Sequence, residues 1–277
     1  MTRPGLSKPA YLGYNDGMQI PWLVTLSIIF CLTVPAAHAT GGLTPSDILK
    51  LATHGRTPVQ AVFFNSQDTA LCIADEGPGK PAYGSLRTAM ERLGCKAGVN
   101  GGYFSADAAR TPLGLLRHAG KSVTPLSTNG FTVSGVLYDT GKDIRLERSK
   151  SLSFPVERMQ EAIQGGPFLV ERGKPVAGLN NVKSARRTFV ATDGAGNWCL
   201  AVTSPVTLHE LADTLAKQGV SGKLKVQTAL NLDGGSSSAL WEETSGRRMS
   251  NLKPVRNYVG IMPRRTGAPT TRVKNKR

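Results

Sequence analysis

The stretch TLHELADTLAKQG, residues 207–219, carries the clearest secondary-structure signal in the chain. Thr207 and Glu210 form the Ser/Thr-x-x-Glu pattern of a capping box, which predicts that a helix begins after Thr207. Gly219 is the residue expected to end that helix. The apolar side chains on one face of the helix would be Leu208, Leu211, Ala212 and Leu215. We expect this face to pack against a β-sheet.

The segments on either side of this helix alternate short strand-like runs with one further helix. SLRTAMERLG, residues 85–94, opens with a serine and stops at a glycine, which predicts a helix over about 85–93. TFVATDGAGNWCLAVT, residues 188–203, predicts a hairpin that turns at 193–196. Because the chain has 31 glycines and only 6% aromatic residues, strands and turns should dominate.

These patterns predict an α+β fold, with a strand-rich sheet packed by at least two helices. We assign this single mixed domain to residues 56–263 and treat residues 40–55 as an N-terminal lead-in.

The first 39 residues differ from the rest of the chain. Arg3 and Lys8 precede the apolar stretch 22–34, and Ala37 and Ala39 have the small-x-small spacing that signal peptidase recognises. The apolar stretch is shorter than the roughly 20 residues needed to span a bilayer. We therefore expect residues 1–39 to be a cleaved signal peptide and the mature chain to have no transmembrane span. The protein would then be periplasmic or secreted, whether translation starts at Met1 or Met18.

The chain is strongly basic, with a formal net charge of +15. Removing residues 1–39 takes away two cations and one anion and leaves +14, a charge that attracts anionic polymers. Export makes nucleic acid an unsuitable partner, so we expect anionic envelope polymers such as phosphorylated polysaccharides or lipids instead. Residues 264–277 are basic and rich in turn formers, which is typical of a disordered tail.

Three cysteines remain in the mature chain, namely Cys72, Cys95 and Cys199. An odd number allows at most one internal disulfide, and in an exported protein we expect it between Cys72 and Cys95. Three buried thiols are the alternative. No Cys-x-x-Cys spacing indicates zinc or redox chemistry.

Three glycine pairs, each beside an amide or carboxylate side chain, mark a candidate site. They lie in GVNGGYF (98–104), AIQGGPFLV (162–170) and LNLDGGSSS (230–238). Paired glycines let backbone N–H groups approach a ligand, which suits phosphate oxygens and sugar hydroxyls. Each pair alone is also a common turn, and Asp233 alone is a common turn cap. Three pairs beside Asn100, Gln164, Asn231 and Asp233 favour a shared site.

Other familiar chemistries fit less well. HELAD, residues 209–213, lacks the second histidine of the helical zinc motif because Asp213 stands in its place. GLLRHAGKS, residues 114–122, has Leu115 where a phosphate-binding loop needs its leading glycine. The sequence contains no Gly-x-Ser-x-Gly elbow of a serine hydrolase.

The three turns, together with TPLGLL (111–116), RRTFVATDGAGN (186–197) and the helix at 207–219, occur in the order typical of the phosphodiester glycosidase family. The chain resembles this family, and most closely its exported single-domain bacterial branch, over nearly all of residues 56–263. The most specific elements are Asn-x-Asp-Gly-Gly-x-Ser at 231–237 and Arg-Thr at 187–188. Gln164 and Phe189 depart from the residues that many relatives carry, and they bear on substrate detail.

The resemblance implies a hydrolase that cuts between the anomeric carbon of a sugar and phosphate in a sugar 1-phosphodiester, such as a phosphorylated glycan or glycolipid. Phosphate is a good leaving group, so one carboxylate and a set of phosphate donors are enough for this chemistry. Asp233 would be catalytic with Asn231 orienting hydroxyls, and Arg187 would hold the phosphate. The substrate-binding residues would be Asn100, Gly101, Gly102, Gln164, Gly165, Gly166, Arg187, Thr188, Gly234, Gly235 and Ser236.

No cofactor is expected, although a divalent cation held by Asp233 and phosphate stays open. Two other functions also stay open. One is a binding module that holds an envelope glycan without cleaving it, and the other is an acyl hydrolase that uses a serine of GGSSS (234–238). Tyr103 and Phe104 either stack on a sugar or belong to the core.

Overall fold

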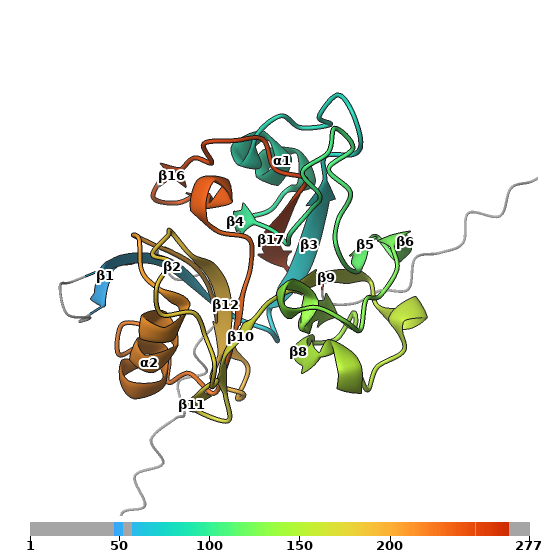
Figure 1. Ribbon diagram of the computed structural model, residues 1–277. Coiled ribbons are helices and arrows are strands. Elements are labelled where there is room, and N and C mark those ends of the chain that lie inside the picture. The colour runs from blue at the N-terminus through green and yellow to red at the C-terminus, as the bar shows by residue number, and fades with distance from the viewer. Residues whose placement is uncertain (1–46, 52–56, 247, 266–277) are drawn as a thin grey trace, which may run out of the picture. The chain divides into compact units, whose positions relative to one another are not determined.

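The computed structural model describes residues 47–51, 57–246 and 248–265 of the 277-residue chain. In this part of the chain there are two α-helices, α1 (Leu86–Leu93) and α2 (Leu208–Gln218), and three sheets in which every strand pairing is antiparallel (Figure 1). Neither helix is long and apolar enough to cross a membrane. The predicted signal peptide and residues 266–277 of the predicted tail lie outside the described residues.

We call the sheets A, B and C. In order across each sheet, sheet A contains β1 (Asp47–Leu51), β2 (Thr57–Asn65), β13 (Asn197–Thr203), β12 (Thr188–Thr192), β14 (Thr228–Asn231), β10 (Phe168–Glu171) and β11 (Lys174–Pro175). Sheet B contains β16 (Arg248–Met249), β15 (Leu240–Glu242), β4 (Ala97–Asn100), β17 (Asn257–Pro263) and β3 (Thr69–Asp75). Sheet C contains β6 (Lys121–Thr124), β5 (Leu116–His118), β9 (Glu161–Gly165), β7 (Gly135–Asp139) and β8 (Ile144–Arg148).

Four short 3-10 turns complete the described structure: η1 (Phe131–Val133), η2 (Ser149–Ser151), η3 (Val156–Arg158) and η4 (Gly235–Ser237). The α+β class and the abundance of strands agree with the prediction, whereas the single sheet that we expected is replaced by three. Several pairings join distant parts of the chain, such as β2 with β13 and β3 with β17. The hydrophobic pattern of a strand does not specify such a partner.

Helix α2 forms as its sequence predicts. The N–H of Glu210 donates to the Thr207 hydroxyl at 3.1 Å and the N–H of Thr207 donates to the Glu210 carboxylate at 3.1 Å, so the capping box is complete. The apolar face of α2 packs on sheet A in one core cluster, where Leu211 and Leu215 join Phe189 and Ala201.

Helix α1 begins after Ser85, whose hydroxyl accepts from the N–H of Thr88, and ends at Gly94 in the left-handed conformation. The helix packs on sheet B through Met90. Gly98 and Gly260, which are register partners in β4 and β17, make this contact possible. A Cβ on Gly98 would lie 2.3 Å from the Met90 sulfur, and one on Gly260 would lie 2.6 Å from it.

The largest core cluster is shared by all three sheets. Sheet A contributes Leu200 and Leu230, sheet B contributes Val259, and sheet C contributes Leu137 and Ile163, among others. Because β4, β9 and β14 all pack into this core, their C-terminal ends come together. The three glycine pairs lie at or just after these ends.

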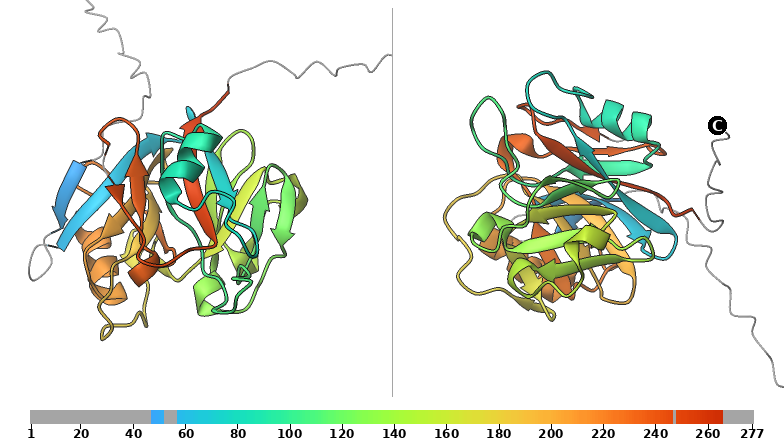
Figure 2. Two further views of the ribbon diagram at one scale, coloured as in Figure 1. Left: turned by 90° about the horizontal axis from the view of Figure 1, so that it is seen from above. Right: turned by 90° about the vertical axis from the view of Figure 1, so that its right-hand side faces the viewer.

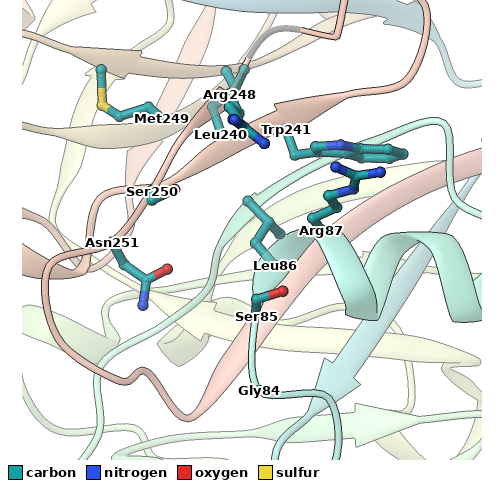
Figure 3. A pocket seen from close by; sticks show the side chains of 10 residues that line it. All are labelled: Gly84, Ser85, Leu86, Arg87, Leu240, Trp241, Arg248, Met249, Ser250 and Asn251. Atoms are coloured by element: carbon teal, nitrogen blue, oxygen red, sulfur yellow. The ribbon is translucent and has the colours of Figure 1, made fainter.

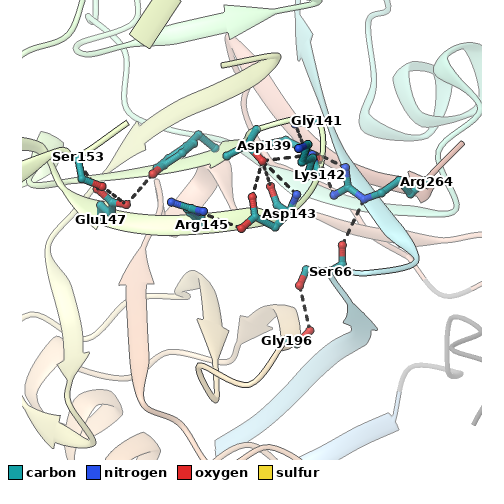
Figure 4. A network of polar contacts seen from close by, with 12 residues as sticks. Ser66, Asp139, Gly141, Lys142, Asp143, Arg145, Glu147, Ser153, Gly196 and Arg264 are labelled. Carbon is teal, nitrogen blue, oxygen red and sulfur yellow. Dashed lines mark hydrogen bonds and ion pairs between the residues drawn. The ribbon is translucent and has the colours of Figure 1, made fainter. Parts of the chain in front are cut away.

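The ordered structure extends beyond residues 56–263 at both ends. In the predicted lead-in, β1 pairs with β2 at the edge of sheet A. Arg264, which we predicted to begin the disordered tail, donates to both carboxylate oxygens of Asp139 at 3.1 Å and to the carbonyl oxygen of Ser66 at 3.3 Å (Figure 4). This buried ion pair joins the residue after β17 to the end of β7 in sheet C. Asp139 also accepts the N–H of Leu71 in β3 at 2.9 Å, which is a second contact between sheets B and C.

The predicted disulfide is not present, because Cys72, Cys95 and Cys199 are all free, buried thiols. This is the alternative that the sequence left open. Cys72 and Cys95 are nevertheless neighbours. A hydrogen bond between the two thiols, together with burial, raises the pKa of Cys72.

Candidate functional site

The three glycine-pair turns meet in space, each contributed by a different sheet. The N–H of Asp233 donates to the carbonyl oxygen of Gly101 at 3.0 Å, which joins the turn after β14 to the turn after β4. The N–H of Gly166 donates to the carbonyl oxygen of Asn231 at 2.8 Å, which joins the turn after β9 to β14. The predicted shared location of the three turns is therefore present in the fold.

Asp233 is the carboxylate at this junction. Its Oδ1 accepts the N–H of Gly234 at 2.8 Å, and its side chain also accepts from the Ser237 hydroxyl. Burial raises the pKa of the Asp233 carboxyl, and these two hydrogen bonds only partly oppose that effect. A half-buried carboxylate with a raised pKa is suited to take a proton.

Asn100 positions Asp233 and is not available to a substrate. It is 1% exposed, and its Nδ2 donates to the carbonyl oxygen of Asp233 at 2.7 Å. Its Oδ1 accepts the Thr188 hydroxyl at 2.7 Å and the N–H of Ala239 at 3.0 Å. Thr188 is fully buried and also contacts the Ser238 hydroxyl at 3.2 Å. We therefore revise the predicted substrate-binding role of Asn100 and Thr188 to a supporting one.

Asn231, two residues before Asp233, contacts Tyr103. Its buried Nδ2 donates to the Tyr103 hydroxyl at 2.9 Å, to the Gly166 carbonyl at 3.1 Å and to the Leu232 carbonyl at 2.6 Å. Among the described residues its Oδ1 has no hydrogen-bond partner.

The charges of Asp233 and Arg187 influence the pKa of the Tyr103 hydroxyl. Burial and the negative charge of Asp233 raise the pKa of Tyr103 to about 12, whereas the positive charge of Arg187 and the bond with Asn231 act in the opposite direction. At neutral pH this hydroxyl stays protonated and can donate a hydrogen bond.

Arg187 is a buried cation without a carboxylate partner in the described part of the chain. Its Nε donates to the Val206 carbonyl at 3.0 Å and one Nη donates to the Lys183 carbonyl at 2.6 Å. Burial lowers the pKa of its guanidinium. Carbonyl oxygens position the group but do not neutralise it, so Arg187 remains suited to bind an anion.

Arg186 approaches the same turn from the adjacent position. Its Nε donates to the Gly235 carbonyl at 3.1 Å, and its own carbonyl accepts the N–H of Gly235 at 2.8 Å. One Nη of Arg186 is buried and has no partner within the described residues. Gly234, Gly235 and Ser236 are the residues of this turn predicted to bind substrate. Because the N–H groups of Gly234 and Gly235 are already bonded, only Ser236 has an N–H that no described residue accepts.

Gln164 has no polar atom left for a ligand, contrary to its predicted role. The side chain makes five hydrogen bonds, which tie β9 to the segment 115–133 and to Ser149. It holds the loop before η1 in place.

Most of the predicted ligand-facing glycines face protein instead. A Cβ would lie 2.1 Å from Asn257 Oδ1 if built on Gly101, and 2.3 Å from the Gln164 carbonyl oxygen if built on Gly102. Gly165, Gly166 and Gly234 would meet backbone oxygens at 2.9, 2.2 and 2.8 Å. Gly235 differs, because its φ is +64° and no atom lies within 4 Å of the Cβ position. It is the glycine of these pairs whose surroundings leave room for a ligand.

Three polar residues of this region were missed when the site was predicted. They are Tyr103, for which the sequence allows either a sugar-stacking or a core role, Arg186 and Asn257, and the last two are absent from the predicted site. Asn257, at the start of β17, lies against Gly101, and neither end of its buried amide has a partner among the described residues. The signal for Asn257 lies in its pairing in sheet B, which the sequence does not reveal.

No group of three or more His, Cys, Asp or Glu side chains that could hold a metal ion occurs among the described residues. A separate pocket of about 450 Å³ is shown in Figure 3. It is lined in part by Ser85, Arg87, Trp241, Arg248 and Asn251. The N–H of Leu252, next to Asn251, donates to the Ser236 carbonyl at 2.7 Å, so the pocket borders the Asp233 turn.

Comparison with known protein families gives one match. The sequence profile of the phosphodiester glycosidase family matches residues 93–262, which include the three glycine-pair turns. No curated protein matches the sequence.

Similar solved structures share the fold at low identity. The catalytic domain of zebrafish N-acetylglucosamine-1-phosphodiester α-N-acetylglucosaminidase, auto-inhibited by its pro-peptide, is 16% identical with a TM-score of 0.56, over 81% of this chain and 85% of that one. A hypothetical protein of Synechocystis is 16% identical with a TM-score of 0.53, over 78% of this chain, which spans only 61% of the Synechocystis protein. A Burkholderia pseudomallei protein described as exported is 12% identical with a TM-score of 0.54, over 78% of this chain and 76% of that one.

Proposed function

Because the chain belongs to the phosphodiester glycosidase family, we propose that it hydrolyses a sugar 1-phosphodiester between the anomeric carbon and the phosphate oxygen. The proposed enzyme is exported and acts in the periplasm or outside the cell, as the N-terminal 39 residues indicate. Its substrate class is a phosphorylated glycan or glycolipid, for which the positive charge of the chain provides attraction.

One observation supports this chemistry above the others. The half-buried carboxylate of Asp233 and the guanidinium of Arg187, which has no carboxylate partner among the described residues, lie on adjoining segments, so a base and an anion-binding cation share one site. The segments are joined by the N–H of Gly235, which donates to the Arg186 carbonyl at 2.8 Å, and by the N–H of Leu232, which donates to the Thr188 carbonyl at 2.8 Å. In the proposed reaction the oxygen of a water molecule bonds to the anomeric carbon. The bond from that carbon to the phosphate oxygen breaks, and its electron pair leaves with the phosphate.

Each charged group has a defined part in this step. The proton of the attacking water passes to Asp233, whose raised pKa favours proton uptake. Arg187 and the Ser236 N–H stabilise the departing phosphate, whose extra negative charge develops as the bond breaks. Tyr103 donates a hydrogen bond to a substrate oxygen.

The acyl hydrolase alternative receives less support. The Ser237 hydroxyl is bonded to Asp233, and the Ser238 hydroxyl is fully buried against Thr188. Of the three serines, only Ser236 is more than slightly exposed.

The test is incubation of the purified protein with a panel of sugar 1-phosphodiesters, followed by mass spectrometry of free sugar and phosphomonoester. We expect release by the wild type and by Asp68→Asn, a matched change at an exposed carboxylate, but not by Asp233→Asn. Release by Asp233→Asn at the wild-type rate would remove Asp233 from the mechanism. Binding of a panel member without any release would instead favour the glycan-binding module.

A further inference from the structure

Four of the five large apolar side chains that the described residues expose belong to loops around the Asp233 turn. They are Leu113, Phe131, Val182 and Leu252, which are 47%, 54%, 89% and 76% exposed. The fifth, Val123, is 41% exposed and lies on the edge strand β6 of sheet C. Single exposed apolar residues are ordinary, but four around one site need a reason.

Backbone contacts tie two of these residues directly to the site. The N–H of Leu113 donates to the Tyr103 carbonyl at 2.9 Å, and the N–H of Leu252 donates to the Ser236 carbonyl at 2.7 Å. The tips of both loops are therefore fixed relative to Asp233.

Phe131 and Val182 also lie on segments that contact the site. The Phe131 carbonyl oxygen lies 2.2 Å from the Cβ position of Gly166, which shows how tightly the two backbones pack. Asn180 accepts the N–H groups of Val182 and Lys183 at 3.1 and 2.7 Å, and the Lys183 carbonyl accepts Arg187 at 2.6 Å. The four residues lie in separate connecting segments, those between β4 and β5, β6 and β7, β11 and β12, and β16 and β17, which can be followed in Figures 1 and 2.

Basic residues accompany the apolar ones. Lys183 follows Val182 and Lys253 follows Leu252, and both lysines are exposed. Segments 103–113, 125–134, 176–187 and 248–256 contain a single acidic residue, Asp107. The same segments contain seven basic residues, of which Lys183, Arg248 and Lys253 are exposed and Arg110 and Arg186 are half-buried. The other two are not available to lipid, because Arg187 is buried in the candidate site and Arg256 is buried in an ion pair with Asp75.

We propose that this face docks on an anionic lipid bilayer and that the sugar 1-phosphodiester cleaved at Asp233 is anchored in that bilayer. The four apolar tips stand on separate loops, as suits insertion between lipid headgroups, and the neighbouring lysines pair with anionic lipid. A lipid-linked substrate would then meet Asp233 and Arg187 without leaving the membrane surface. The inference that the substrate is anchored in the bilayer rests on the proposed function, whereas the inference that this face docks on a bilayer does not.

Docking is tested by flotation of the purified protein with vesicles of phosphatidylcholine alone or with 30% phosphatidylglycerol, a composition chosen to be about one-third anionic. We expect the anionic vesicles to bind the wild type and Asp233→Asn equally. The double variant Val182→Ser/Leu252→Ser should bind about tenfold more weakly, because two apolar side chains are removed from the headgroup region. Val123→Ser is the matched control and should bind like the wild type. All proteins begin at Thr40, the expected start of the mature chain, so the apolar stretch 22–34 does not contribute to vesicle binding.

Docking would be overturned if salt abolished vesicle binding while Val182→Ser/Leu252→Ser bound vesicles like the wild type. That result would indicate a general attraction to polyanions and no insertion of apolar side chains. An equal loss in Val123→Ser would also overturn it.

The substrate half is tested with N-acetylglucosamine 1-phosphate esterified to a hexadecyl chain in vesicles or to methanol in solution. We expect Val182→Ser/Leu252→Ser to slow hydrolysis of the vesicle-bound ester only. Hydrolysis of the methyl ester by a protein that does not bind vesicles would overturn this inference and leave the proposed function standing. Vesicle binding without hydrolysis of either ester would overturn the proposed function and the lipid-anchored substrate, while the docking surface would stand.

Discussion

The side-chain amide of Asn100 donates to the backbone carbonyl oxygen of Asp233 at 2.7 Å, so the end of a strand in sheet B positions a carboxylate that follows a strand in sheet A. The other end of the amide accepts the Thr188 hydroxyl and the Ala239 N–H, which leaves Asn100 a purely supporting residue. The catalytic candidate therefore depends on an interaction between sheets.

Asn100→Asp tests this support. The carboxylate keeps both acceptor functions but loses the donor and places a charge beside the Asp233 carbonyl. We expect the free energy of unfolding to fall by about 1–3 kcal/mol and kcat to fall more than KM rises. Chemical denaturation and steady-state kinetics measure the two effects, with Asn65→Asp, a more exposed amide that donates to Asn197, as control. A variant with normal kcat would show that the position of Asp233 does not depend on Asn100.

Gln164 provides the opposite test, because we assign its side chain to structure alone. Gln164→Leu removes five hydrogen bonds and leaves the buried N–H of Leu115 and the half-buried N–H of Ser127 without acceptors. We expect a loss of about 1–3 kcal/mol for each buried group left unpaired, with KM unchanged in the protein that remains folded. Thermal denaturation measures the loss of stability, and kinetics below the unfolding transition measure KM. Gln160→Leu at an exposed position is the control. A raised KM without loss of stability would return Gln164 to the substrate-binding set.

Arg187 is expected to carry phosphate affinity. Inorganic phosphate should inhibit the wild type competitively, and Arg187→Gln should weaken this inhibition about tenfold or more, since a charged hydrogen bond to an anion contributes about 1.5–3 kcal/mol. Arg92→Gln removes an exposed arginine that likewise donates to a carbonyl oxygen, at 3.1 Å, and should leave inhibition unchanged. Equal inhibition of all three proteins would place the phosphate elsewhere.

Local structure was predictable from the sequence where a few neighbouring residues determine it. The capping box of α2, the serine cap of α1 and the hairpin between β12 and β13 all occur as predicted. The division into three sheets was not predictable, because pairings such as β3 with β17 join residues that are nearly 200 positions apart.

The glycine pairs likewise show which part of the site the sequence predicts and which part it does not. Their pattern indicates that a side chain is excluded, but it does not reveal what occupies the space. At Gly101 and Gly102 the occupants are Asn257 and the Gln164 backbone, whereas at Gly235 the space is open. Tyr103 enters the site through a contact with Asn231 from another sheet, a contact that no local pattern encodes.

The raised pKa of Asp233 gives the pH dependence a definite sign. Only the ionised carboxylate can take a proton, so kcat/KM should fall with decreasing pH at a value above the ordinary Asp pKa of about 3.9. Ser237→Ala removes a hydrogen bond that favours the ionised form and should move this acid limb to still higher pH. Ser245→Ala, at an exposed serine outside the site, is the control for the pH–rate profile. A limb that moves to lower pH in Ser237→Ala would contradict the assignment of the limb to Asp233.

The same shift predicts a change in stability. A carboxyl whose pKa is higher in the folded than in the unfolded protein stabilises the fold below the unfolded value of about 3.9, and this contribution is lost as pH rises through the folded pKa. Asp233→Asn stays neutral at every pH, so its free energy of unfolding should exceed that of the wild type at pH 7 by more than at pH 4. Urea denaturation of both proteins at the two pH values measures the difference. An Asp233→Asn protein that is less stable at pH 7 would show that the hydrogen bonds from Gly234 and Ser237 outweigh the burial of the charge.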